Sequence, residues 1–145
     1  MPGKNDAGQP VRGSGFLKRQ SGSRPLSGAQ SGGYLDLAHG ECNALLLPHV
    51  VDFNFHHAAD KYRHIAGEMG VHVAGLSDRE ARKMLTFHLL EMNRKLGITG
   101  SLKERGVQSD LLPLLAGKAI QDPCNATNPR PPVRADLEAV YAESM

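Results

Sequence analysis

Residues 39–53 read HGECNALLLPHVVDF, and this stretch decides the fold. Residues 44–47 are all apolar, and further apolar residues follow as far as Phe53. A helix that is apolar on several sides is usually buried between its neighbours. Pro48 lies inside the stretch and removes the backbone hydrogen bond to the carbonyl of Ala44. We therefore expect a buried helix with a kink at this proline.

The segments that follow also repeat their apolar residues with a helical period. Ser77 and Glu80 form the pattern of a capping box, and an apolar stripe runs behind them until Gly97. The same periodicity predicts shorter helices over residues 58–69, over residues 109–119 and around residues 137–141. No alternating pattern typical of a strand exceeds a few residues. The predicted fold class is therefore all-α, a bundle of about five helices.

The composition divides the chain into a basic head and a mildly acidic body. Six Gly, four Ser and three Pro lie among residues 1–30, together with five Lys or Arg and one Asp. Large apolar residues are too sparse there to offset the entropy of ordering the segment. We expect residues 1–31 to be a disordered basic tail rich in Gly, Ser and Pro, and residues 32–145 to form one helical domain.

The whole chain has 145 residues and a net charge of +2, which excludes several classes of protein. This charge is too small to indicate a nucleic-acid partner. No apolar run approaches the ~18 residues of a membrane span. Two cysteines cannot form a disulfide framework and favour a reducing compartment. We expect no nucleic-acid or membrane partner and a cytoplasmic location.

The seven histidines are the residues most able to bind a metal, but their spacing matches no known metal motif. His88 lies on an apolar helical stripe and is expected to be a core histidine with a hydrogen-bonded ring. His39 differs by its context, since it precedes Gly40 where the buried helix begins. Cys42 follows three residues later, but two ligands do not make a site, and a small packed thiol explains it better.

Several longer motifs of the chain resemble those of a known protein family. Residues 32–50 read GGYLDLAHGECNALLLPHV, and residues 127–130 read TNPR. The motifs DFN at 52–54, IAGEMG at 65–70 and LGI at 96–98 fall between them. In this order they resemble the C-terminal helical domain of iron-dependent (group III) alcohol dehydrogenases. The resemblance covers roughly residues 32–145.

The resemblance implies a two-domain oxidoreductase of which this chain carries one incomplete domain. The family binds NAD(P) in an N-terminal α/β domain and holds iron or zinc through one Asp and three His. His39 matches the last metal-binding His, whereas Ala29 and Pro25 stand where two further family histidines are expected. Three of four ligands and the dinucleotide domain are thus not recognised. We expect neither tight binding of metal or NAD(P) nor catalysis by this chain alone.

Three interpretations of such a chain stay open. It is a truncated member of the dehydrogenase family, a non-catalytic interaction or regulatory module, or one half of a split dehydrogenase. Helix faces that lack their family neighbours favour association. The expected partners are a second copy of the chain or a complementary dehydrogenase chain.

Overall fold

The computed structural model describes residues 39–145, and the side chains from Gly40 onward. Five α-helices occur in this range: α1 (His39–Asn54), α2 (Ala59–Glu68), α3 (Asp78–Lys95), α4 (Leu112–Ala119) and α5 (Arg134–Glu143). Short 3-10 turns occupy Phe55–His57, Ser109–Leu111 and Pro123–Thr127, and residues 39–145 contain no strand. The prediction of an all-α fold with about five helices is confirmed. The tail predicted over residues 1–31 lies outside the described residues.

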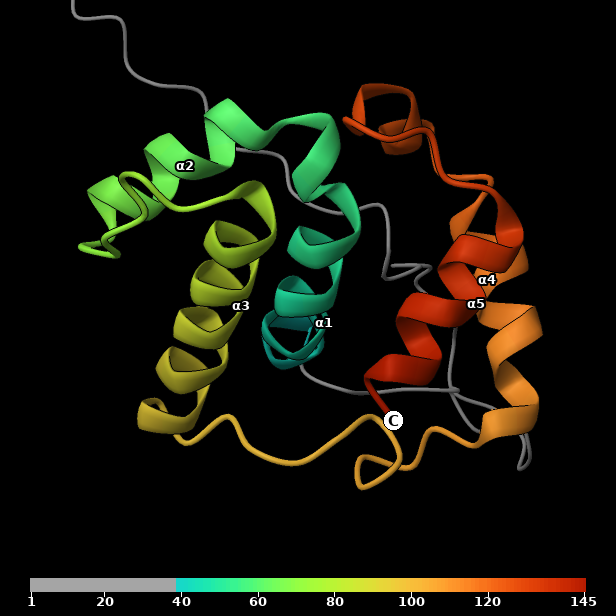
Figure 1. Ribbon diagram of the computed structural model, residues 1–145. Helices are drawn as coiled ribbons and strands as arrows, with labels where there is room; N and C mark the ends of the chain where they lie inside the picture. Colours follow the sequence, from blue (N-terminus) through green and yellow to red (C-terminus); the bar gives the residue numbers. More distant parts are fainter. Residues whose placement is uncertain (1–38) are drawn as a thin grey trace, which may run out of the picture.

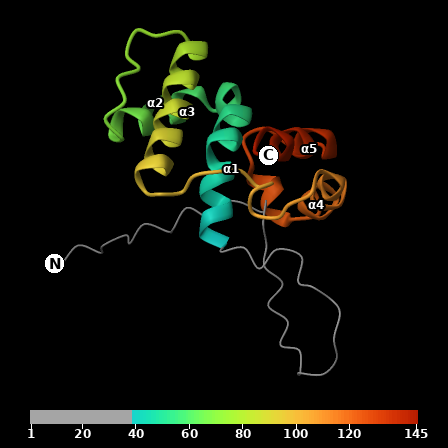
Figure 2. The same ribbon diagram turned by 90° about the horizontal axis from the view of Figure 1, so that it is seen from below.

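Helix α1 lies between two halves of the molecule, with α2 and α3 on one side and α4 and α5 on the other (Figures 1 and 2). Each half has its own apolar core, and α1 contributes to both. Beside α2 and α3 the buried residues are Val51, Phe55, Ala66, Val71, Val73, Ala81, Leu85 and Leu89. Beside α4 and α5 they are Leu45, Leu46, Leu102, Val107, Ala116, Ala119, Leu137, Val140 and Tyr141. The prediction that α1 is buried on several faces is confirmed, except at Leu47, which is 42% exposed.

Pro48 is buried within α1, and the helix continues past it to Asn54. A proline donates no backbone hydrogen bond, so the carbonyl of Ala44 loses its partner within the helix. Asn93 of α3, which is only 6% exposed, donates its side-chain amide to that carbonyl over 2.6 Å. A side chain of one helix therefore replaces the hydrogen bond that the proline removes from another.

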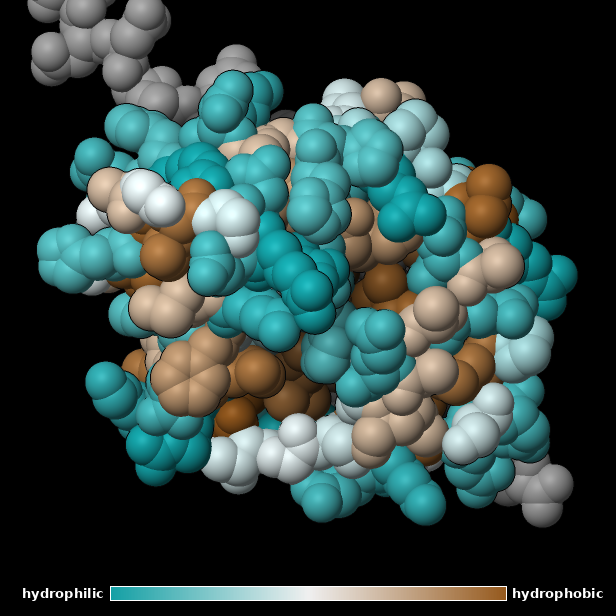
Figure 3. All heavy atoms as spheres, in the orientation of Figure 1, coloured by the Kyte–Doolittle hydropathy of each residue, from teal (hydrophilic) through white to brown (hydrophobic). Residues whose placement is uncertain are grey.

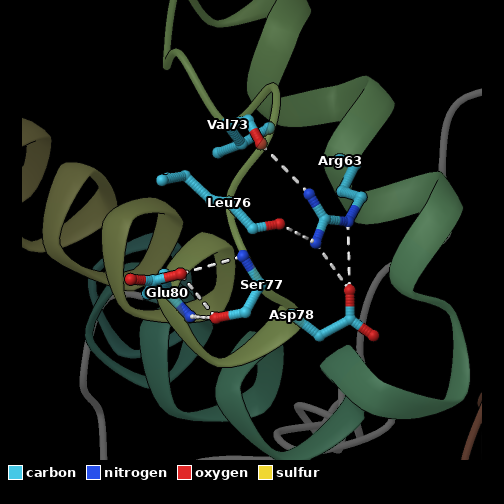
Figure 4. Close-up of polar contacts among 6 residues, drawn as sticks. All are labelled: Arg63, Val73, Leu76, Ser77, Asp78 and Glu80. Atoms are coloured by element: carbon cyan, nitrogen blue, oxygen red, sulfur yellow. Dashed lines mark hydrogen bonds and ion pairs between the residues drawn. The ribbon is translucent and has the colours of Figure 1, made fainter.

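In the half built from α2 and α3, hydrogen bonds join residues that are close in the sequence (Figure 4). Ser77 caps α3: its hydroxyl accepts from the backbone of Glu80, whose carboxylate accepts from the Ser77 backbone, as the sequence predicts. Arg63 of α2 donates to the carboxylate of Asp78 and to the carbonyls of Val73 and Leu76. These bonds fix the loop between α2 and α3, so that the two helices share one core.

The half built from α4 and α5 is held by contacts between distant segments. Arg134 at the start of α5 donates to the carbonyl of Pro113 in the first turn of α4 over 2.9 Å. At the other end of α5, the buried Ser144 accepts a backbone hydrogen bond from Leu102 over 2.9 Å. The long loop between α3 and α4 is thereby fastened to the C-terminus, and residues near Leu102 enter the core.

Candidate functional site

The one predicted metal ligand, His39, is the first residue of α1. Its side chain lies outside the described part of the structure, so its role as a ligand stays a prediction. Gly40 follows it and is exposed, and a Cβ added there would meet no atom within 4 Å. The start of α1 is therefore not enclosed by the described residues.

Cys42 is the nearest described residue that could bind a metal, but it packs into the protein. It is 3% exposed, and burial raises the pKa of its thiol above the usual value, although Arg105 opposes the shift. A raised pKa keeps the thiol protonated, whereas metals bind the thiolate. Among residues 40–145, no three His, Cys, Asp or Glu side chains are placed to share a metal. The described residues thus do not fit the family's metal site.

The other histidines are dispersed over the described surface. His56, His57, His64 and His72 are exposed. His49 is partly buried in α1, with its Nδ1 3.7 Å from a carboxylate oxygen of Glu143 in α5. His88 is half-buried, and no described residue hydrogen-bonds its ring, so the expectation of a core histidine was wrong. It lies at the edge of the buried face of α3 and not at its centre.

A shallow hollow of about 230 Å³ lies between α1, α3 and the loop that follows α3. Its lining residues are Leu45, His49, Leu90, Asn93, Arg94, Ile98, Thr99 and Gly100. Arg94 is already paired with Glu91, and the amide of Asn93 is engaged by Ala44. The hollow is therefore lined mainly by apolar residues, by Arg94, whose charge is already paired, and by His49.

The motif at residues 127–130 ties the C-terminal half to the end of α1. The side-chain amides of Asn54 and Asn128 exchange two hydrogen bonds of 2.9 and 2.8 Å. The guanidinium of Arg130 lies 4.0 Å from the ring centre of Phe53 and pairs with Asp136 in α5. The motif therefore has a structural role in this chain, because it joins α1 to the segment before α5.

The apolar periodicity of the sequence does not mark Asn54 and Asn93 as structural residues. Both are almost fully buried, at 2% and 6% exposure. An asparagine on an otherwise apolar helical stripe is the signal that could have found them, because a buried amide requires partners. The partner of Asn93 could have been sought among carbonyls that lack a donor, such as the one four residues before Pro48.

The five helices and the motifs that join them lie within one continuous match to a protein family. The chain belongs to the Fe-containing alcohol dehydrogenase family, and residues 11–145 match the C-terminal part of that family. The match begins 21 residues before residue 32, where the sequence motifs placed its start. Part of the basic head is therefore related to the family as well.

Individual relatives agree with this assignment. The chain is 37% identical over 134 residues to a lactaldehyde reductase of Escherichia coli and 34% identical over 116 residues to an NAD-dependent methanol dehydrogenase of Bacillus methanolicus. These alignments cover 92% and 80% of this chain, but only 35% and 30% of the relatives. The chain thus spans about a third of the length of the curated relatives it matches.

Solved structures show the same relationship. A crystal structure of a 1,3-propanediol oxidoreductase matches with a TM-score of 0.73 and 31% identity. An alcohol dehydrogenase from Oenococcus oeni matches with a TM-score of 0.73 and 30% identity. Each match covers 79% of this chain and 30% of the other. In residues 39–145, no helix has the length and apolar character that crossing a membrane requires.

Proposed function

We propose that this chain supplies the C-terminal helical part of an iron-dependent, NAD(P)-linked alcohol dehydrogenase and is inactive on its own. The observation that carries the proposal is the family match over residues 11–145 in a chain that spans 35% of the E. coli lactaldehyde reductase. Related proteins are named as NAD-dependent and NADPH-dependent dehydrogenases, which supports a nicotinamide cofactor in the complete enzyme. The alcohol substrate would belong to that enzyme and not to this chain.

The donor set supports inactivity of the isolated chain. Catalytic metal sites generally use three protein ligands and leave one position open. His39 is the only ligand that the family motif assigns here, and the described residues offer no group that completes a site. The chain by itself would therefore bind neither iron or zinc nor NAD(P) tightly. We also place it in the cytoplasm, because a chain with only two cysteines is typical of a reducing compartment.

A complementation assay tests both parts of the proposal. The purified chain is mixed with ferrous iron or zinc, NAD or NADP and 1,2-propanediol, and reduced cofactor is followed by absorbance. No turnover above a metal-only blank is expected. Turnover should appear when the other two-thirds, roughly, of the E. coli lactaldehyde reductase are added as a separate polypeptide.

His39→Ala should abolish the complemented activity, whereas His72→Ala, at an exposed loop position, should leave it unchanged. Turnover by the chain alone would contradict the claim of inactivity. A silent mixture of two folded polypeptides would contradict the catalytic role and favour a non-catalytic interaction module. The α3 surface described next is the specific observation in favour of that second function.

A further inference from the structure

Helix α3 is apolar on two opposite faces. Ala81, Leu85 and Leu89 face the core, as the hydrophobic stripe of the sequence predicts. On the other side lie Met84, Phe87 and Leu90, which are 44%, 62% and 46% exposed. We call these last three residues the outer stripe.

Residues three apart on a helix are neighbours, so the outer stripe covers about 120° of the helix circumference. The helix of a soluble monomer normally presents polar residues opposite its core face. Apolar atoms are visible over α3 on the face of the molecule shown in Figure 3. An exposed and contiguous apolar stripe of this kind marks a contact surface.

The charged residues around the outer stripe are arranged symmetrically about Phe87, with opposite signs. Lys83 lies four residues before Phe87 and Glu91 four residues after it. Glu80 lies seven residues before and Arg94 seven residues after. All four lie on the same half of the helix as the outer stripe, at 100° per residue. Lys83 and Arg94 are thus each matched by an acidic residue at the same distance from the centre.

Such a helix is complementary to a second copy of itself in the antiparallel direction. A two-fold axis at Phe87 places Met84 opposite Leu90, Lys83 opposite Glu91 and Glu80 opposite Arg94 of the second copy. The same surface then serves both partners, as in an isologous contact. Only Arg79 and Lys95, at the ends of the helix, meet a like charge, and solvent screens exposed charges there.

The existing contacts leave the four charged residues available. Lys83 makes no ion pair with a described residue. Glu80 uses its Oε2 atom for the cap on Ser77, and Arg94 and Glu91 pair within their helix. An ionised carboxylate has about four acceptor positions. Glu80 and Glu91 can therefore accept a second cation without releasing the first partner.

We propose that this chain forms an antiparallel homodimer along α3, with the two outer stripes in contact and the two-fold axis near Phe87. The inference is independent of the proposed function. The 18 residues of α3 span only about 27 Å, so the contact is small for a permanent complex. A reversible dimer with a dissociation constant on the order of micromolar is expected.

Sedimentation of the full chain over about a hundred-fold range of concentration measures this equilibrium. Phe87→Glu should weaken the dimer at least about ten-fold, because it places two carboxylates on the axis. Leu114→Glu, at an exposed apolar position on α4, is the control and should dimerise like the wild type. Circular dichroism confirms that each variant keeps its helices. A monomeric wild type, or dimerisation unaffected by Phe87→Glu, would overturn the proposal.

A charge exchange tests the antiparallel register. Lys83→Glu alone and Glu91→Lys alone should each weaken self-association several-fold, because both put like charges opposite each other twice. An equimolar mixture of the two variants should associate again, since both contacts in the mixed dimer join unlike charges. Failure of the mixture to associate would overturn the proposed register. If residues 1–38 or another protein cover the stripe instead, the wild type stays monomeric and the proposal fails.

Discussion

The two halves on either side of α1 are built by different means. In the half with α2 and α3, the decisive contacts join residues close in sequence: Ser77 with Glu80, and Arg63 with Asp78 15 residues later. In the half with α4 and α5, Asn54 bonds Asn128 across 74 residues. Local signals therefore specify the cap of α3 and the loop that precedes it, whereas a long-range contact attaches the segment before α5 to α1.

The largest expected effect is the loss of a buried side chain from the 3-10 turn that directly follows α1. Phe55 is fully buried and stacks on Tyr62 with ring centres 5.7 Å apart. Phe55→Ala should cost about 3–5 kcal/mol of the free energy of unfolding, which approaches the total for a small domain. Because α1 belongs to both cores, we expect both halves to unfold in one transition.

Urea denaturation followed by circular dichroism measures this change. Leu114→Ala, at an exposed position of α4, is the control and should shift the midpoint little. Two separate transitions in Phe55→Ala, with one of them at the wild-type midpoint, would show that the halves are independent and that the shared helix does not couple them.

A smaller effect is expected at the hydrogen bond that Asn93 donates to the carbonyl of Ala44, which Pro48 leaves without a donor in its own helix. Asn93→Ala should destabilise the protein by about 1–3 kcal/mol, because it leaves the carbonyl of Ala44 buried without a donor. In a Pro48→Ala background the backbone amide at position 48 can donate to that carbonyl. The cost of Asn93→Ala should therefore be smaller there.

A double-mutant cycle by urea denaturation gives this coupling energy. Equal costs of Asn93→Ala in both backgrounds would mean that the amide does not compensate for the proline. The coupling energy also shows how far the helical structure of α1 depends on α3 and not on its own backbone hydrogen bonds.

The smallest expected effect is local to the start of α3. Ser77→Ala removes the cap and should cost about 1 kcal/mol. Hydrogen bonds from the Ser77 side chain and backbone lower the pKa of Glu80 below its ordinary value of 4.5. The folded protein thus favours the ionised carboxylate. This contribution is complete above pH 4.5 and is lost as the pH falls through the lower pKa of the folded state.

Melting temperatures of the wild type and Glu80→Gln, compared from neutral to acidic pH, test the sign. The stability difference between the two proteins should shrink as the pH falls below about 4.5. Glu138→Gln, on an exposed ion pair of α5, serves as a comparison for a carboxylate outside a cap. A difference that stays constant with pH would contradict the lowered pKa.

Periodicity and capping patterns predict the helices, but they do not predict correctly for every helix which side chains are buried. The Ser77 cap and the buried residues of α5 agree with the sequence pattern. The stripe predicted over residues 58–69 included Ile65, which is 45% exposed. Its helix is only ten residues long, and the core contacts just one side of it.

Local patterns can mark Asn54 and Asn93 as buried amides, but they do not identify the distant segments that these residues contact. The partners of Asn54 and Asn93 lie 74 and 49 residues away, and no spacing rule links them. The metal role of His39 rests on a motif alone, because motifs identify a family ligand without showing the ligands that complete the site. The outer stripe of α3 has the same helical period as its buried stripe, so periodicity alone does not tell which of the two faces the core.

The buried proline of α1 also has a consequence for the order of folding. An isolated peptide of residues 39–54 would lack one hydrogen bond in its centre and would be a poor helix in water. The missing bond is supplied only when the C-terminal turns of α3 arrive. Helix α3, with its own cap, can form early, and α1 is expected to become fully helical upon docking against it. The central helix of the molecule is in this sense completed only after α3.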